Sequence, residues 1–157
     1  VRMIKVLAEA SGFNGMVGGQ YIDIASTGKE LTLEELRAMH MLKTGALIRA
    51  SLALGGIAAG ATEEQLAALD EYGTHIGLAF QVVDDILDVE SDTQTLGKTQ
   101  GKDADADKAT YVKLMGLEGA KAEAQRLLQA ALDALEGFGE SADHLRDLAR
   151  YIVERDR

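Results

Sequence analysis

The sequence contains no proline, no cysteine and no tryptophan, and aromatic residues make up only 4% of it. Without proline, no backbone amide loses its hydrogen, and the wealth of alanine, leucine and glutamate favours helices. Without cysteine, disulfides and thiolate metal sites are excluded, which suits a reducing cytoplasm, where we expect the protein to reside. At 157 residues, the chain suffices for one domain or for a piece of a larger one.

The net charge of -10 argues against a nucleic-acid surface. It would also repel anionic ligands unless lysines or bound cations screened it. No uninterrupted apolar run reaches the roughly 18 residues that a membrane span requires, so we expect none. The chain begins in helical rhythm at Val1-Arg2-Met3, without an initiator methionine, and we expect it to be a fragment.

Five helical stretches are predicted, which indicates an all-α fold, a bundle of long and mostly antiparallel helices. They cover Met3–Ala25, Thr32–Ala59, Thr62–Asp92, Glu118–Leu135 and Ser141–Arg155, with a polar loop at Thr93–Asp107. Glycine inside a helix costs roughly 1 kcal/mol relative to alanine. The first stretch therefore predicts a close approach by another helix or by a ligand, because it contains Gly12, Gly15, Gly18 and Gly19.

An apolar seam follows the third stretch at alternating spacings of three and four. It consists of Leu66, Leu69, Gly73, Ile76, Phe80, Val83 and Leu87. Such a seam must pack against other helices over its whole length. At about 100° per residue, a polar face adjoins it, formed by Gln81, Asp84, Asp85 and Asp88.

The acids on this face suggest a metal site. Asp84 and Asp88 lie one turn apart, so their carboxylates can converge on one hard cation, which would remove their mutual repulsion. A solvated acidic face is the ordinary alternative. The position of the acids beside the seam, directly after the mostly apolar run 78–83, favours the metal site.

Two lysines stand where an anion could be bound. Lys43 lies in the centre of the apolar stripe of the second stretch, where a lysine needs a partner. A structural ion pair or a stem that reaches water is as well supported as a cation directed at a ligand. Lys98 stands between Gly97 and Gly101, and glycines let a backbone approach an anion closely, although a plain surface loop would look the same.

Two other metal sites are excluded by spacing. Asp103, Asp105 and Asp107 imitate the start of a calcium loop, but Lys108 and Leu114 occupy the positions that require glycine and glutamate. A di-iron bundle needs histidine three residues after glutamate, a spacing that the sequence lacks. We therefore expect its helical histidines, among them His40 and His75, to be polar positions without a catalytic role.

With these features in view, the sequence resembles the trans-isoprenyl diphosphate synthase family, and in particular its bacterial short-chain members of the farnesyl diphosphate synthase (geranyltranstransferase) type. Five segments match in order over essentially the whole chain. They are Gly18-Gly19-Gln20 with Asp23, Lys43-Thr44-Gly45, Phe80 through Asp88, Gly97-Lys98 with Gly101 and Asp103, and Lys108 with Thr110-Tyr111. Ordered agreement at five places is more specific than any single motif.

The resemblance implies a role for each matching residue. Asp84, Asp85 and Asp88 match the family's second aspartate-rich motif, which binds Mg²⁺ on the diphosphate of the allylic substrate. The lysines that contact this diphosphate are matched by Lys43, Lys98 and Lys108. Residues near the reacting carbon are matched by Thr44 and Gln81, and positions that line the substrate cavity by Gln20, Asp23 and Phe80.

The resemblance also implies the isoprenoid synthase fold, present here in part, with residues 1–157 forming the C-terminal portion of one polyprenyl synthetase domain. Its substrates would be isopentenyl and allylic diphosphates, its cofactor Mg²⁺ and its assembly a homodimer. The family's first aspartate-rich motif lies upstream of the matched region, so we expect the chain alone to be inactive. Two alternatives stay open: another class I terpenoid enzyme, such as a cyclase or longer-chain synthase, and a non-catalytic partner subunit.

Overall fold

The computed structural model describes residues 1–95 and 108–156, and all regular structure in these two ranges is helical. The all-α prediction is therefore confirmed. In chain order the elements are α1 (Arg2–Ser11), α2 (Met16–Ala25), α3 (Leu33–His40), a π-helical turn η1 (Met41–Gly45), α4 (Ala46–Ala58), α5 (Glu63–Thr95), α6 (Tyr111–Ala134), a 3₁₀ segment η2 (Glu136–Ala142) and α7 (Asp143–Glu154).

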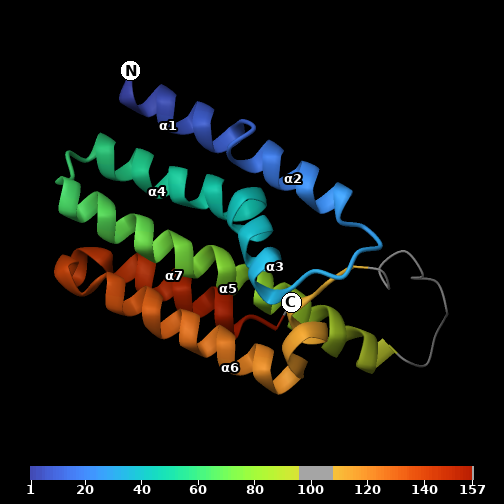
Figure 1. Cartoon of the computed structure of the whole chain (residues 1–157). Coiled ribbons are helices and arrows are strands. Elements are labelled where there is room, and N and C mark those ends of the chain that lie inside the picture. The colour runs from blue at the N-terminus through green and yellow to red at the C-terminus, as the bar shows by residue number, and fades with distance from the viewer. Residues whose placement is uncertain (96–107, 157) are drawn as a thin grey trace.

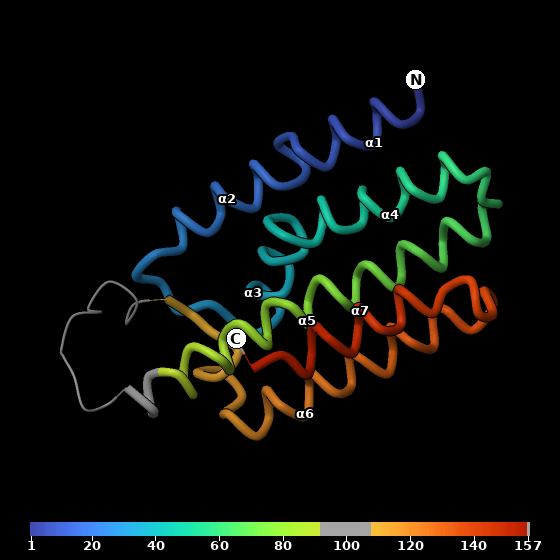
Figure 2. The backbone as a smooth tube through the Cα atoms, turned by 180° about the vertical axis from the view of Figure 1, so that it is seen from behind, coloured from blue at the N-terminus to red at the C-terminus, as the bar shows by residue number. Residues whose placement is uncertain are grey.

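The helices form layers around α5, the longest of them at 33 residues. α1 and α2 lie end to end in an outer layer over α4, and α5 runs beneath α4 (Figure 1). On the other side of α5 lie α6 and α7, as the view from behind also shows (Figure 2). Consecutive helices α4, α5 and α6 alternate in direction, which confirms the antiparallel bundle.

The predicted seam of α5 lies in the core. Leu69, Ile76 and Val83 are buried, and residues from a second side of the helix, among them Tyr72 and Val82, are buried as well. One group of core residues joins α5 to α3 and α6, and another joins it to α6, η2 and α7. Burial on two sides explains why α5 keeps its helical form over so long a distance, since tertiary packing supplies most helical stability.

The first predicted helix is wrong in one respect, because it is broken into α1 and α2. Gly12 is extended at the end of α1, and α2 begins only after Gly15. The prediction of a close approach is confirmed at Gly19, where a Cβ atom would lie 2.5 Å from the Cα of Lys43 and 2.8 Å from the carbonyl carbon of Leu42. The glycine thus lets the α2 backbone touch η1.

The second predicted helix begins as expected at Thr32, whose side chain and that of Glu35 form a reciprocal capping box. It is not one regular helix, however, because η1 interrupts it at residues 41–45. The stretch Leu33–Ala58 is also long and apolar enough to cross a membrane by length and composition, a test that core helices of bundles pass too. The expectation of no membrane span rests on the lack of an uninterrupted apolar run, and this stretch contains Arg37, Lys43 and Arg49.

The boundaries of the last two helices also differ from prediction. α6 begins at Tyr111 rather than Glu118, since Thr110 caps an additional turn by accepting a hydrogen bond from the Lys113 amide. Gly116, with φ of 76°, separates this turn from the predicted part of the helix. α7 begins two residues late, because Glu136–Ala142 forms the 3₁₀ segment η2.

Candidate active site

Three residues from distant parts of the chain form a group that we call the lysine–aspartate cluster: Asp23 of α2, Lys43 of η1 and Lys108 before α6. The Nζ atom of Lys43 lies 2.5 Å from Oδ2 of Asp23, and that of Lys108 lies 3.6 Å from the same oxygen. The Asp23 side chain is only 12% exposed, whereas that of Lys43 is 35% exposed. Of the two readings left open for Lys43, the ion pair is therefore present in the structure.

The charge of the cluster is well defined. Burial opposes the ionisation of Asp23, but the hydrogen bond and the charge of Lys43, assisted by Lys108, outweigh this effect and lower the pKa of Asp23 below its usual value. Asp23 is therefore ionised at neutral pH. Two lysines against one carboxylate leave the cluster with a net positive charge, in a protein whose overall charge is -10.

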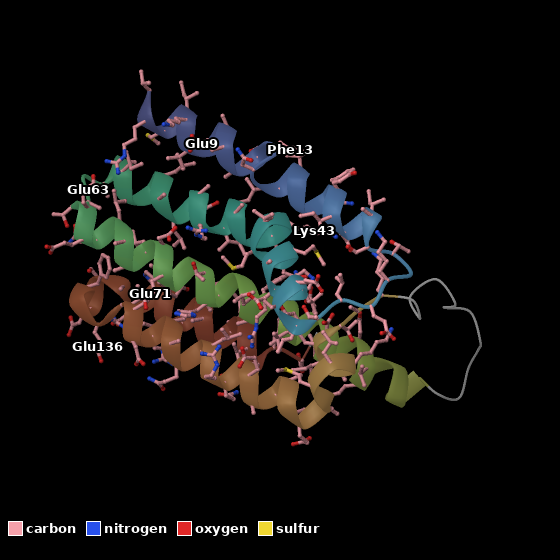
Figure 3. All side chains as sticks on the ribbon, viewed as in Figure 1. Glu9, Phe13, Lys43, Glu63, Glu71 and Glu136 are labelled. Carbon is pink, nitrogen blue, oxygen red and sulfur yellow. The ribbon has the colours of Figure 1, made fainter. Side chains whose placement is uncertain are left out.

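The π turn η1 sets the position of Lys43. Its five residues wind more loosely than an α-helix, and such turns are frequent at functional sites. η1 is held between two glycines, Gly19 of α2 and Gly77 of α5; a Cβ atom at Gly77 would lie 3.2 Å from the Cα of Gly45. Figure 3 shows Lys43 where η1 meets the layer of α1 and α2.

The second group, which we call the acidic face, consists of Asp84, Asp85 and Asp88 on α5. Asp84 forms an ion pair with Arg155, which follows α7. The guanidinium of Arg155 also stacks on the ring of Phe80, with its central carbon 4.5 Å from the ring centroid. Asp84 and Phe80 are half-buried and Asp88 is exposed, so the face borders the core as predicted.

Asp85 is directed toward α6. Its Oδ2 accepts a hydrogen bond of 2.8 Å from the backbone amide of Tyr111, the first residue of that helix. Burial raises the pKa of Asp85 to about 6; the Tyr111 hydrogen bond opposes the rise, and the charges of Asp88 and Asp84 add to it. A carboxylate at a helix N-terminus satisfies a free amide and interacts favourably with the helix dipole.

The remaining predicted residues lie in different surroundings. Thr44 and Gln81 are half-buried on η1 and α5, and Gln20 is exposed on α2. Lys98 lies outside the described residues, as do Gly97, Gly101 and Asp103. The structure therefore brings Asp23, Lys43 and Lys108 together, whereas Asp84 and Asp85 on α5 are directed to different partners, Arg155 and Tyr111.

The ligand type and the spacing of the acidic face suit a hard cation such as Mg²⁺. Carboxylate oxygens are the ligands that Mg²⁺ prefers, and Asp84 and Asp88 are one helical turn apart. Burial is the main cause of the raised pKa of Asp85, and the charges of Asp88 and Asp84 add to it; a divalent cation would relieve this repulsion between the acids. In the arrangement described, Asp84 and Asp85 are turned to protein partners, and within residues 1–95 and 108–156 no three acidic or histidine side chains converge on one point.

A buried pair connects the two groups. His40, the last residue of α3, lies next to η1, and its Nδ1 is 3.2 Å from the hydroxyl of Tyr111. His40 is only 9% exposed, so it is a core position rather than the polar helix position predicted. Burial, the main cause, lowers the pKa of His40 to about 4, with the charge of Asp23 opposing this effect and that of Lys43 assisting it. The histidine is therefore neutral at pH 7.

His40 predicts a pH-dependent stability. Between pH 7 and 5 the unfolded chain binds a proton at this residue, with its ordinary pKa near 6.5, whereas the folded chain does not. When the pH is lowered from 7 to 5, the free energy of unfolding should therefore fall, by roughly 2 kcal/mol more in the wild type than in His40→Gln. Urea unfolding at pH 7, 6 and 5 measures this difference.

His144 supplies the matched control, because it is exposed on α7. The variant His144→Gln should lose stability between pH 7 and 5 as the wild type does. Parallel pH curves for the wild type and His40→Gln would contradict the assignment of a neutral, buried His40.

Two residues of the site, Tyr111 and Arg155, are not among the predicted site residues. Tyr111 belonged to a matching segment, but its contacts with His40 and Asp85 were not predicted. Arg155 had no local signal, since it is one of several charged residues after the last apolar position. Its partner Asp84 is 71 residues away in the sequence. Only the arrangement of α5 against α7 reveals the pair.

An all-helical bundle with lysines and an aspartate-rich helix face gathered on adjoining helices defines the class of isoprenoid-synthase-like proteins. The chain belongs to the polyprenyl synthetase family, whose model matches residues 1–151. It is 47% identical over 161 aligned positions to the farnesyl diphosphate synthase of Escherichia coli K12, covering 100% of the chain and 54% of that protein. The geranylgeranyl pyrophosphate synthase of Catharanthus roseus chloroplasts is 46% identical, with 99% of the chain and 44% of that protein covered.

Solved structures agree with this assignment. A putative farnesyl-diphosphate synthase from Marinomonas sp. MED121 superposes with a TM-score of 0.83 at 46% identity, covering 97% of this chain and 51% of that one. The geranyltransferase of Helicobacter pylori, solved with magnesium and isoprenyl diphosphate, gives a TM-score of 0.76 at 36% identity, with 98% and 50% covered. The chain thus spans about half the length of the curated relatives that it matches.

Proposed function

We propose that this chain forms one side of the active site of a short-chain prenyltransferase, which condenses isopentenyl diphosphate with an allylic diphosphate. The observation that carries the proposal is the lysine–aspartate cluster, whose two lysines give a net positive charge beside a helix that bears the three acids. The resemblance to farnesyl diphosphate synthases supports the reaction class. The Helicobacter pylori geranyltransferase, a complex with magnesium and isoprenyl diphosphate, supports the ligands.

In the proposed reaction, the allylic carbon–oxygen bond breaks and its electron pair leaves with the diphosphate. The double bond of isopentenyl diphosphate then attacks the allylic cation, a carbon–carbon bond forms and a proton is lost. The developing charge on the leaving group must be neutralised by preorganised cations. We assign this role to Lys43, Lys98 and Lys108, which would bind diphosphate oxygens.

Asp84 and Asp88 would hold Mg²⁺. Asp85, on the same helix, would keep α5 against α6 through the hydrogen bond that it accepts from the Tyr111 amide. When bound, the metal supplies positive charge to the departing diphosphate. Asp23 keeps Lys43 and Lys108 together before substrate arrives, and Gln20 and Phe80 would line the substrate cavity. Thr44 and Gln81, which lie next to Lys43 and Phe80 in the sequence, are the neutral polar groups that we place near the reacting carbon.

A homodimer is part of the proposal. Among the described residues, large apolar side chains on the surface are concentrated in α1, α2 and the turn between them, at Met3, Ile4, Leu7, Phe13, Val17, Tyr21, Ile22 and Ile24. α1 buries none of its residues, and Phe13 points away from the bundle (Figure 3). An apolar surface of this extent requires a cover, and a second copy is the one that we propose. Residence in the cytoplasm stays a prediction.

Product formation tests the proposal. The 157-residue chain, given Mg²⁺ with isopentenyl and dimethylallyl diphosphates, is expected to form no product, because it carries only one aspartate-rich motif. A chimera that adds the part of the Escherichia coli enzyme not covered by this chain is expected to form farnesyl diphosphate. Its mass by light scattering should be that of a dimer.

Each outcome separates the alternatives. A geranylgeranyl product would indicate a longer-chain synthase, a reading that the match to the Catharanthus roseus enzyme supports. A cyclic product would indicate a cyclase. A folded chimera without any turnover would favour the non-catalytic subunit, and turnover by the chain alone would contradict the idea that it forms one side of the site.

A further inference from the structure

Arg155 occupies a position that the proposed reaction does not explain. Its guanidinium is enclosed between Asp84, with which Nη2 forms an ion pair, and the ring of Phe80. The side chain is only 16% exposed, although the residue lies just beyond the last helix. Arg155 therefore neutralises the charge of Asp84, the first acid of the acidic face.

The contact is not fully satisfied. The Nε atom of Arg155 is buried and, among the described residues, has no hydrogen-bond partner. A buried donor without a partner costs free energy, so the guanidinium gains hydrogen bonds if it moves to a wetter place. Asp84 remains 43% exposed, which leaves one side of its carboxylate accessible from solvent.

A neighbouring cavity offers such a place. It has a volume of about 260 Å³ and lies between α5, α6 and the C-terminal end of α7, with Arg155, Val153, Glu90 and Lys121 among the residues that line it. Glu90 is a carboxylate acceptor that is 42% exposed and now pairs with Lys121 at 2.8 Å. If the Arg155 side chain rotated into this cavity, it would pair with Glu90 instead of Asp84.

We propose that Arg155 is an internal counter-cation, which holds Asp84 while no metal is bound and leaves it when Mg²⁺ binds. The inference rests on the proposed function, because it takes Asp84 as a metal ligand. A guanidinium and a divalent cation repel each other at the same carboxylate, so the Arg155–Asp84 pair weakens metal binding and metal binding weakens the pair. The apparent metal affinity is thus lowered by the stability of the pair.

The departure of Arg155 has a second effect. The face of Phe80 that the guanidinium covers becomes accessible at the same time. Phe80 precedes Gln81 and lies one turn before Asp84, so an apolar surface beside the metal appears only after the metal is bound. Metal binding would in this way prepare the site for the hydrocarbon part of a substrate, which orders the two binding events.

Calorimetric titration of the 157-residue chain with MgCl₂ tests the proposal. The variant Arg155→Gln is expected to bind Mg²⁺ about fivefold more tightly than the wild type, in keeping with the modest strength of a partly solvated ion pair. Arg155→Lys, which keeps the charge, should bind as the wild type does. Hydrogen exchange in residues 149–156 of the wild type should become faster when Mg²⁺ is added.

Arg150 provides the matched control, since it is an exposed arginine whose partner, Asp147, lies three residues away on α7. Arg150→Gln should leave the Mg²⁺ affinity unchanged. Equal or weaker Mg²⁺ binding by a folded Arg155→Gln, with binding lost in Asp84→Asn, would overturn the role of Arg155 and leave the metal site intact. The absence of Mg²⁺ binding in all variants would overturn both the metal site and this inference.

Discussion

Replacing Gly19 by alanine is expected to destabilise the protein by about 3 kcal/mol, because inserting a methyl group into a closely packed contact forces backbones apart. The new Cβ would lie 2.5 Å from the Cα of Lys43 and 2.8 Å from the carbonyl carbon of Leu42. Both obstacles are backbone atoms, so no change of rotamer relieves the clash. In the variant, α2 must therefore move away from η1. Urea unfolding measures the loss in the free energy of unfolding.

Gly55 supplies a matched control for this substitution. It also lies inside a helix, α4, but a Cβ atom there would meet nothing within 4 Å. Gly55→Ala is therefore expected to stabilise the chain by roughly 0.5–1 kcal/mol through helix propensity. If Gly19→Ala proved as harmless as Gly55→Ala, the close approach of α2 to the turn that carries Lys43 would be wrong.

The second large effect concerns the acidic face. In the active chimera, Asp84→Asn is expected to lower kcat by roughly 10²–10³-fold, the usual cost of removing one preorganised charge contact from the transition state. The amide cannot replace an anionic ligand of Mg²⁺, and the variant keeps the volume of the side chain. Rates are measured at saturating isopentenyl and dimethylallyl diphosphates over a range of Mg²⁺ concentrations.

Glu71→Gln is the control on the same helix. Glu71 is an exposed carboxylate whose partner, His75, lies one turn further along α5, and surface pairs of this kind contribute little. We expect its kcat to remain within about twofold of the parent chimera, because a surface pair is worth at most ~1 kcal/mol to folding and nothing to the reaction. An Asp84→Asn variant with unchanged kcat would remove Asp84 from the proposed metal site.

Much of the fold could be predicted because local rules and tertiary packing agree along most of the chain. The alternating spacing from Leu66 to Leu87 predicted one long helix, and α5 includes that whole range. Thr32 with Glu35 marked the start of the second helical stretch, since a capping box is a signal contained within four residues. Both signals are local and therefore readable from sequence.

The interruptions could not be predicted in the same way. The residues of η1 include no proline and only one glycine, Gly45, so nothing in their side chains distinguishes a π turn from an α turn. Thr110 caps the additional turn at the start of α6, but Gly116, with φ of 76°, separates this turn from the rest of the helix, so the turn is not continuous with the predicted pattern. In both places, the outcome depends on which neighbouring helix the segment packs against.

The candidate site was predictable in its residue types and not in its pairings. Lys43 was identified as a lysine that needs a partner, yet its partner Asp23 comes from another helix, 20 residues earlier. Asp85 was grouped with Asp84 and Asp88 by helical spacing, but it is directed to Tyr111. Choices of this kind are made by the tertiary arrangement, because several partners are chemically equivalent at the level of sequence.

The π turn also sets the rotational phase between α3 and α4. A turn with i to i+5 hydrogen bonds contains one residue more than an α-helical turn, and each residue of an α-helix advances its side chains by about 100°. Every position after Gly45 is therefore rotated by about that angle relative to an unbroken helix. This offset brings Arg49 to Asp70 at 2.7 Å on α5 while α3 keeps Leu36 in the core. The length of the segment 41–45 is thus as strictly determined as the identity of Lys43 within it.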